Sequence, residues 1–272
     1  LEQRGADVVM GGGGFVAGPA GQAARRLKIP LVLTEADRHL GLANRTLARR
    51  ADRVCLAFDI EGRTGEPYMV TGRPVGRAVL EADRGRARQR FGIDPESQCL
   101  LVMGGSLGAR SVNLSAMVAF AERPGRDFDV IHVSGRRDYA DLVKRLESAT
   151  HKERYTLLEY EPNMGDCLAA CDLVLARSGG SVFELTAQGR PAVLVPYPHA
   201  TGDHQTANAE WMADAGAAEV ITDDDLSADL ITESVNRILG DGATLEKMAA
   251  ASLTLARPDA AADIAEEVLK FA

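Results

Sequence analysis

Three loops of this sequence carry residue types that bind anions and hydroxyl groups. The first contains Gly104, Gly105, Ser106, Gly108 and Arg110, after a continuous apolar run and before a segment with helical spacing. Glycines at the end of a buried strand let backbone N–H groups and the next helix dipole face an anion, usually a phosphate. The serine adds a hydroxyl donor, and the arginine can pair with the anion or support the loop. Glycine turns also end many strands for backbone reasons alone.

A second loop of the same kind strengthens the case for a phosphate ligand. Ser178, Gly179, Gly180 and Ser181 lie between an apolar run and a helical segment, on which Glu184 falls one turn in. Two small-residue helix starts at one sheet edge can hold a diphosphate between them. A carboxylate in that first turn can accept both hydroxyls of a ribose, although the helix dipole alone also favours an acidic residue there.

A third loop concentrates hydrogen-bonding side chains after the apolar run that starts at residue 192. It carries His199, Thr201, Asp203, His204 and Gln205, and it enters the next helical segment through Asn208. Histidine and aspartate together can suggest a metal, but a metal site needs more ligands and no others are evident. Binding of sugar hydroxyls is the better interpretation.

The first part of the chain contains another glycine turn, Gly11-Gly12-Gly13-Gly14. Glu35 and Asp37 follow the next apolar run, at the strand end that lines the ligand crevice of a doubly wound sheet. They are therefore the acidic candidates for a general base. A flexible turn is the alternative interpretation of the four glycines. No P-loop and no nucleophile elbow occurs, which disfavours nucleotide hydrolysis and ester hydrolysis.

The elements that must position these loops are short apolar runs that alternate with helical patterns. The runs begin near residues 7, 30, 53 and 68, and then near residues 99, 129, 155, 172, 192 and 218. Because they are continuous rather than alternating, we expect strands buried on both faces, in parallel sheets covered by helices. The predicted fold class is α/β, with a Rossmann-like unit of about six strands preceded by about four strands of another.

A polar, arginine-rich stretch over residues 71–98 separates the two series and starts with a Gly/Pro turn, so we place the domain boundary near Arg77. The expected parts are residues 1–77, residues 78–255 and a C-terminal helical segment over residues 256–272. The first apolar run follows Leu1 almost at once, without a Met or a secretion signal, so we expect the chain to lack the beginning of its first domain.

Composition narrows the class of protein. No stretch approaches the roughly 20 apolar residues that span a bilayer, and 46% hydrophobic with 26% charged residues is typical of a soluble globular protein. The four cysteines form no CxxC pair, so neither a disulfide framework nor a structural zinc site is expected. A reducing, cytoplasmic setting fits this cysteine usage.

The charge is distributed unevenly, with +4 over residues 1–77 and −12 over the remainder, so the first part could face an anionic partner. Within it, arginines gather beside two leucines, as in a helix that lies on an anionic membrane surface. These residues are Arg45, Arg49, Arg50 and Arg53, with Leu42 and Leu47. A merely solvated helix face is the alternative.

Taken together, the motifs GGGGFVAGPAG, GGSLGARSVN, ARSGGSVFEL and GRPAVLVPYPHATGDHQTANA resemble those of the MurG family. Its members are bacterial transferases that add GlcNAc to the undecaprenyl-linked muramyl-pentapeptide lipid I and so form lipid II. The resemblance covers nearly the whole chain and is strongest from Leu100 to Val220. It implies the GT-B architecture, with two Rossmann-like domains and a last helix that returns to the N-terminal domain.

The resemblance also implies which residues bind the donor, UDP-GlcNAc. Ser106 and its glycines would contact the phosphates or the uridine, and Glu184 would contact the ribose. Gln205, beside His204, would meet the GlcNAc hydroxyls. Asn208 belongs to the same expected set.

Further positions follow from the same resemblance. Tyr160 and Glu161 would supply backbone groups to the uracil. Family members carry Asn-Pro-Val-Arg where this chain reads Arg-Pro-Val-Gly-Arg, so Arg77 would replace the shifted arginine of the donor site. The acceptor side would be formed by Gly11 to Gly14, Asp37 and Asn44.

The implied reaction is an inverting displacement at the anomeric carbon, in which helix N-termini stabilise the departing diphosphate without a cofactor or a metal. The base would be Glu35, Asp37 or a residue of the absent segment. The expected partners are UDP-GlcNAc, a polyprenyl-linked acceptor and the inner face of the cell membrane, with no nucleic acid. Three alternatives stay open: a transferase for another lipid or natural product, a non-catalytic UDP-sugar-binding module, and a UDP-GlcNAc 2-epimerase.

Overall fold

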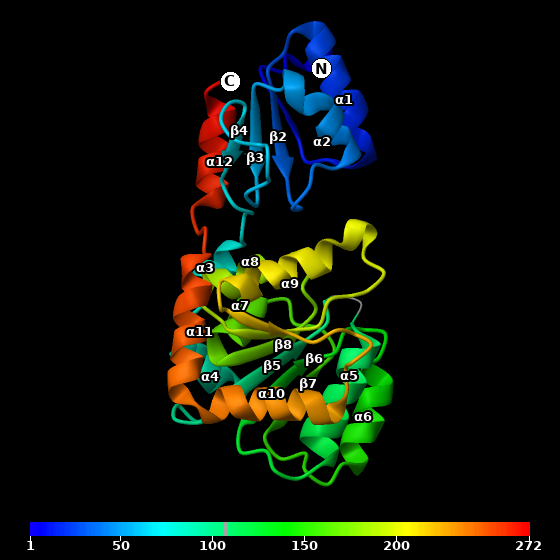
Figure 1. The fold of residues 1–272 in the computed structure, drawn as a ribbon, viewed down its shortest axis with the longest axis vertical. Coiled ribbons are helices and arrows are strands. Elements are labelled where there is room, and N and C mark those ends of the chain that lie inside the picture. Colours follow the sequence, from blue (N-terminus) through cyan, green and yellow to red (C-terminus); the bar gives the residue numbers. More distant parts are fainter. Residues whose placement is uncertain (106–107) are drawn as a thin grey trace. The chain divides into compact units, whose positions relative to one another are not determined.

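The computed structural model describes residues 1–105 and 108–272, apart from the side chains of Arg4 and Thr201. The chain divides into two compact units, which can be followed in Figure 1. Unit 1 comprises Leu1–Val75 and Arg257–Ala272, and unit 2 comprises Gly76–Ala256. The last segment of the chain therefore folds with the first strands.

Unit 1 is a parallel sheet with helices on both faces. In the described residues its strands pair in chain order: β1 (Val9–Gly11), β2 (Leu31–Glu35), β3 (Arg53–Leu56) and β4 (Tyr68–Val70). Its helices are α1 (Gly14–Leu27), α2 (Leu42–Leu47) and α12 (Ala260–Leu269). Leu31 and Leu33 pack with α1 and α2, whereas Val32 packs with α12 on the other face. Burial on both faces explains why the strand sequences are continuously apolar.

The basic helix expected between residues 42 and 53 is shorter than predicted. A 3₁₀ turn, Ala48–Arg50, follows α2, and Arg53 already begins β3. The Nε atom of Arg53 lies 2.6 Å from Oε2 of Glu267 on α12. Arg53 is therefore not part of a basic helix face, because its guanidinium is used to hold the last helix against the sheet.

Unit 2 is a parallel sheet with the strand order β10-β9-β8-β5-β6-β7 among the described residues. Numbered from β5, this is the Rossmann order 3-2-1-4-5-6. Its strands are β5 (Cys99–Met103), β6 (Asp129–Val133), β7 (Tyr155–Leu158), β8 (Leu173–Ala176), β9 (Ala192–Leu194) and β10 (Ala218–Val220). Each strand lies where an apolar run predicts one.

The helices of unit 2 connect these strands and cover the sheet (Figure 1). They are α3 (Arg77–Leu80), α4 (Arg84–Phe91), α5 (Arg110–Met117), α6 (Tyr139–Ser148), α7 (Met164–Ala170), α8 (Val182–Ala187), α9 (His204–Asp214), α10 (Ala228–Gly240) and α11 (Gly242–Thr254). A π-helical turn, Val118–Glu122, extends α5, and a 3₁₀ turn, Thr201–Asp203, precedes α9. Leu100 and Val102 of β5 belong to a core shared with α5 and α10.

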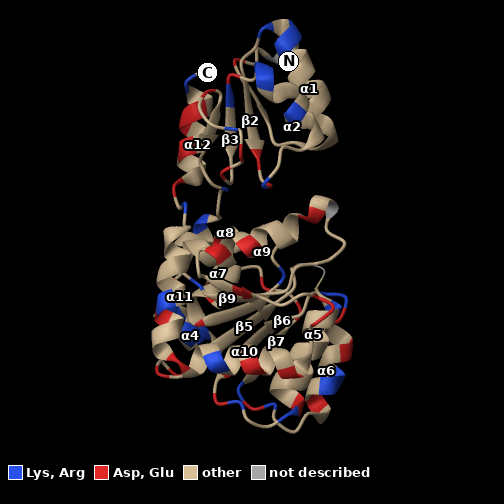
Figure 2. Ribbon diagram, in the orientation of Figure 1, with Lys and Arg blue, Asp and Glu red and all other residues tan. Residues whose placement is uncertain are grey.

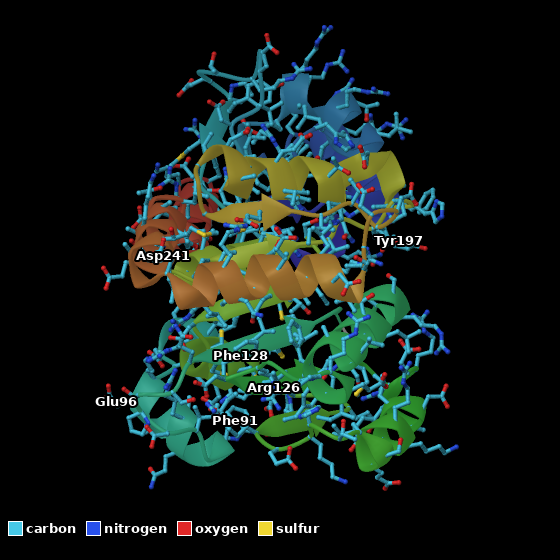
Figure 3. All side chains as sticks on the ribbon, turned by 60° about the horizontal axis from the view of Figure 1, so that its bottom comes forward. Phe91, Glu96, Arg126, Phe128, Tyr197 and Asp241 are labelled. Carbon is cyan, nitrogen blue, oxygen red and sulfur yellow. The ribbon has the colours of Figure 1, made fainter. Side chains whose placement is uncertain are left out.

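Arginine side chains form hydrogen bonds and ion pairs at the amino ends of the strands in unit 2. Arg126, which Figure 3 labels beside Phe128, donates to the carbonyl oxygens of Phe120, Phe128 and His151. The buried Arg88 lies 2.8 Å from the carboxylate of Asp172, which also accepts a hydrogen bond from the backbone N–H at the start of β5. Without these side chains, the backbone groups at the amino ends of the strands would be buried without a hydrogen-bond partner. The arginines therefore stabilise the edge of the sheet opposite to its glycine-rich and polar loops.

Candidate functional site

The strand order itself places a crevice in unit 2. β5 and β8 are neighbours, but the connections after them run to opposite sides of the sheet, which makes their carboxyl ends the topological switch point. A cavity of about 540 Å³ opens there. Among the described residues it is lined by Gly76, Ala78, Val79, Met103, Gly104, Gly105, Val133, Gly135, Glu159, Tyr160, Glu161, Pro162, Asn163, Met164, Gly165, Arg177, Gly179, Gly180, Ser181, Glu184 and Gln205.

The glycine turn after β5 forms one wall of this cavity. Gly104 and Gly105 line it, and Gly105 and Gly108 have φ values of +84° and +80°. A Cβ on Gly104 would lie 2.5 Å from that of Ala109, and a Cβ on Gly108 would collide with the carbonyl oxygen of Ser134. Glycine is thus required by close packing as well as by backbone conformation. The predicted ligand residue Ser106 lies outside the described residues.

Arg110 begins α5 beside this turn, but it is not among the lining residues. Its Nη1 atom lies 3.2 Å from Oδ1 of Asp138, a buried carboxylate. The guanidinium therefore supports the loops after β5 and β6 in this structure. Direct contact of Arg110 with the donor stays a prediction.

The loop after β8 forms the facing wall. Gly179, Gly180, Ser181 and Glu184 line the cavity, and Glu184 lies in the first turn of α8. Ser178, in contrast, is fully buried and donates from its hydroxyl to the carbonyl of Gln205 at 2.7 Å. Its side chain holds the loop and does not face the cavity.

The first turn of α9 reaches the same cavity through Gln205, whose Oε1 accepts a hydrogen bond from the backbone N–H of Tyr197 in the preceding loop. His204 and Asn208 are not among the lining residues. Asn208 is buried and donates from Nδ2 to the carbonyl of Ser178 at 3.0 Å. As with Ser178, its role in the structure is to join the loop after β8 to α9.

Arg177 lines the cavity although the sequence motifs did not single it out. Its guanidinium donates to the carbonyls of Val195 and Pro196 and lies 2.6 Å from the carboxylate of Asp223 and 2.8 Å from Ser111 Oγ. It also lies over the ring of the tyrosine at position 197, which Figure 3 labels. One arginine at the end of β8 thus connects the segments that follow β9 and β10 with the first turn of α5. The only sequence signal was its place directly before the Ser-Gly-Gly-Ser loop.

Tyr160 and Glu161 line the cavity after β7, as the uracil prediction requires. The Glu161 carboxylate forms an ion pair with Arg90, at 2.6 Å, and accepts a hydrogen bond from the backbone N–H of Asn163, at 2.8 Å. Arg90 donates hydrogen bonds to the carboxylates of Glu161 and Asp166, and these bonds raise its pKa. The side chain of Glu161 therefore fixes the loop and leaves backbone groups for a ligand.

Arg77 lies at the start of α3, between two residues that line the cavity. Its own guanidinium is exposed and lies 2.6 Å from the carboxylate of Glu81, which raises the pKa of the arginine through that hydrogen bond. The structure thus directs this side chain along the helix surface. Contact with the donor phosphates stays a prediction.

In unit 1 the structure gives Glu35 a role that conflicts with general-base catalysis. Its Oε1 accepts from the N–H groups of Ala36 and Asp37, and its Oε2 accepts from the N–H of Gly41 and from Asn44 Nδ2. Four donors fill the lone-pair positions of a carboxylate. Glu35 holds the loop between β2 and α2, so Asp37 is the acidic candidate left.

The glycines predicted to form the acceptor side lie close to this loop. A Cβ on Gly13 would lie 3.6 Å from Nδ2 of the buried Asn44, and Gly13 and Gly14 have φ values of +82° and +72°. Gly12 and Glu35 line a cavity of about 180 Å³ within unit 1. The glycine turn and the Glu35 loop therefore meet at the carboxyl ends of β1 and β2.

No group of three or more His, Cys, Asp or Glu side chains in the described part of the chain is placed to hold a metal ion. The four cysteines are free and buried. Burial raises the pKa of Cys171 to about 11, so this thiol stays protonated at neutral pH.

The chain is similar to known glycosyltransferases over most of its length. The family described as "Glycosyltransferase family 28 C-terminal domain" matches residues 99–266, and "Glycosyltransferase family 28 N-terminal domain" matches residues 1–56. A curated relative from Moorella thermoacetica is 39% identical over 97% of this chain and 74% of its own length. It is named UDP-N-acetylglucosamine–N-acetylmuramyl-(pentapeptide) pyrophosphoryl-undecaprenol N-acetylglucosamine transferase.

The chain belongs to the MurG family of glycosyltransferases. The crystal structure of Acinetobacter baumannii MurG superimposes with a TM-score of 0.79 and 29% identity, over 99% of this chain and 75% of that one. The two parallel-sheet units of the present chain therefore have the GT-B architecture.

A UDP-GlcNAc 2-epimerase from Neisseria meningitidis, bound to UDP-GlcNAc, shares the fold with a TM-score of 0.68 over 99% of this chain and 78% of that chain. Its 18% identity shows the fold alone. The MurG family, in contrast, is supported by sequence as well as by structure.

Proposed function

We propose that this chain transfers GlcNAc from UDP-GlcNAc to the polyprenyl-pyrophosphoryl-muramyl-pentapeptide lipid I, giving lipid II. The observation that carries the proposal is membership of the MurG family, whose curated relatives bear that activity in their names. The cavity of about 540 Å³ at the switch point of unit 2 supports it independently, because dinucleotides and nucleotide sugars bind at such points.

Within the cavity we assign the diphosphate to the space between Gly105 and Gly180, where backbone N–H groups and the N-terminus of α5 favour an anion. Glu184 accepts the ribose hydroxyls, and Gln205 meets the sugar. The loop at Tyr160 supplies backbone groups to the uracil.

The proposed chemistry is one displacement with inversion. An acceptor hydroxyl oxygen attacks the anomeric carbon, the bond from that carbon to the diphosphate oxygen breaks, and UDP leaves with the electron pair. The hydroxyl proton passes to a base, for which Asp37 is the candidate in unit 1. Preorganised N–H donors stabilise the charge on the departing diphosphate, and we propose that this makes a divalent metal unnecessary.

We further propose that unit 1 binds the acceptor at an anionic membrane surface. Phe15 and Val16 of α1 and Leu42 of α2 are exposed, and the arginine segments of the same helices are visible as blue in Figure 2. No helix among the described residues is long and apolar enough to cross a bilayer. Sedimentation with phosphatidylglycerol vesicles, compared with phosphatidylcholine vesicles, tests this proposal, and equal binding to both would contradict the electrostatic part.

The donor assignment is tested with Glu184→Ala. Loss of two charge-assisted hydrogen bonds to the ribose should weaken UDP-GlcNAc binding by about 2 kcal/mol, or about thirtyfold. Glu210→Ala, at an exposed position of α9, is the control and should bind normally. Unchanged affinity of Glu184→Ala in calorimetric titration would show that the ribose assignment is wrong.

The reaction itself is tested by supplying UDP-GlcNAc with a lipid I analogue, in EDTA and then in magnesium. Formation of the disaccharide product in EDTA supports the proposal. Activity that appears only with magnesium contradicts the metal-free mechanism. Conversion of UDP-GlcNAc without any acceptor would favour the epimerase instead, and binding without turnover would favour a UDP-sugar-binding module.

A further inference from the structure

A line of buried hydrogen bonds runs from β7 through β6 to α5. Nδ1 of His132 lies 2.7 Å from the hydroxyl oxygen of Tyr155, and Nε2 of His132 lies 3.0 Å from Oδ1 of Asn113. Nδ2 of Asn113 donates to the carbonyl of Ser134 and to Oδ2 of Asp138, both at 2.9 Å. All five residues are buried, and none of their side chains is needed for the chemistry proposed above.

The Asn113 amide fixes the direction of these bonds. Because its nitrogen donates twice, its oxygen must be the atom that faces His132, so the imidazole carries its proton on Nε2 and donates. Nδ1 then accepts the hydroxyl proton of Tyr155. Burial lowers the pKa of His132 to about 3, so the ring stays neutral and keeps this single arrangement at neutral pH.

The line ends on the backbone that shapes the donor cavity. The carbonyl of Ser134, which Asn113 holds, is the atom with which a Cβ on Gly108 would collide. Ser134 also donates from its N–H to the carbonyl of Leu158, at the end of β7. Through Asp138 the line reaches Arg110, the first residue of α5. Gly108, in the glycine turn after β5, therefore packs directly on the Ser134 carbonyl that this network holds.

We propose that Asn113, oriented by His132 and Tyr155, is a positioning residue that sets the diphosphate-binding turn after β5. The inference rests on the proposed UDP-GlcNAc donor and deepens it. A backbone N–H binds an anion well only near 2.7–3.2 Å and close to linearity. A turn displaced by a few tenths of an ångström would therefore bind the diphosphate less tightly, while the nucleoside part of the site would be unaffected.

The test measures the affinities of UDP and of uridine separately, UDP by calorimetry and the weaker uridine by NMR titration. Asn113→Ala should raise the Kd of UDP by about tenfold and change that of uridine by less than about twofold. Tyr155→Phe removes only the far end of the line and should raise the Kd of UDP by about threefold, again without an effect on uridine.

Ser252→Ala is the matched control, since the buried Ser252 hydroxyl also donates to a backbone carbonyl, that of Arg190, away from the cavity. It should lower stability without changing either affinity. If Asn113→Ala does not fold, Tyr155→Phe decides the question alone.

Two results would overturn the inference: UDP affinity within about twofold of the wild type in a folded Tyr155→Phe or Asn113→Ala protein, or equal losses for UDP and uridine. The latter would mean that the network supports the whole cavity rather than the turn. A wild-type chain that binds no UDP refutes the proposed function and this inference with it. A wild-type chain that binds UDP, with variants that bind equally well, refutes the inference only.

Discussion

The packing of the glycine turn after β5 can be tested with two alanine substitutions. Both strain the backbone, but only one of them also introduces a steric clash. Gly105 and Gly108 both have φ near +80°, so alanine is strained at either position. A Cβ at Gly105 would meet no atom of the described residues within 4 Å, whereas a Cβ at Gly108 would collide with the carbonyl oxygen of Ser134. Gly105→Ala therefore measures the backbone cost, and Gly108→Ala measures that cost plus the steric one.

The magnitudes follow from these contacts. A left-handed alanine costs about 1–2 kcal/mol, of which about 0.4–1 kcal/mol is offset by the reduced entropy of the unfolded chain. Gly105→Ala should thus lower the free energy of unfolding by about 1 kcal/mol. The Ser134 carbonyl is held by Asn113 and cannot withdraw without breaking that hydrogen bond, so Gly108→Ala should lose about 1–3 kcal/mol more.

Chemical denaturation followed by tryptophan fluorescence measures this difference within unit 2. The only tryptophan of the chain, Trp211, lies on α9 and packs against Phe183, with ring centroids 5.4 Å apart. Its signal reports unfolding of the unit that contains both glycines. If the two variants were equally stable within about 0.5 kcal/mol, the close contact between Gly108 and Ser134 would be refuted.

The remaining predictions concern stability and thiol chemistry. Asp172→Ala leaves the buried Arg88 without its carboxylate partner, so it should lower the free energy of unfolding of unit 2 by about 3–5 kcal/mol in the same fluorescence assay; a loss under 1 kcal/mol would show that the backbone carbonyls suffice. The pKa of Glu267 is lowered, first by its hydrogen bond to Lys270, so the stability it contributes is present at neutral pH and is lost as the pH falls below the ordinary glutamate value of about 4.3. The protection factors of the α12 amides, which correct for the slower intrinsic exchange at low pH, should fall on acidification, and should fall less in Glu267→Gln; identical protection profiles would contradict the assignment. Burial raises the pKa of Cys55 to about 11, so the native protein should not react with a thiol reagent at pH 8, and rapid modification would contradict its burial.

The order of elements and the loops that carry chemistry could be predicted from the sequence. Continuous apolar runs identify strands buried on both faces, and a glycine-rich or polar loop after such a run lies at a sheet's carboxyl edge. Gly104, Gly179, Glu184 and Gln205 accordingly line one cavity. These signals are local, since each depends on a strand and the few residues that follow it.

The partners of the polar side chains were decided by the tertiary structure alone. Glu35 was a candidate base, yet four donors from the loop that follows it and from α2 occupy its carboxylate. Arg53 was assigned to a basic helix, yet it pairs with Glu267, which is distant in the chain. No local pattern identifies such partners, because they come from other elements or depend on how the backbone turns.

The sequence by itself determined which residues form strands, which loops follow them and, through its motifs, the family to which the chain belongs. Tertiary structure decided which side chains of those loops face the cavity and which hold it: Ser178 and Asn208 turn inward, whereas Arg177 lines the wall. The physical reason is that burial follows from local hydrophobic periodicity, whereas a buried polar group must be paired by whatever atoms the packed chain brings next to it.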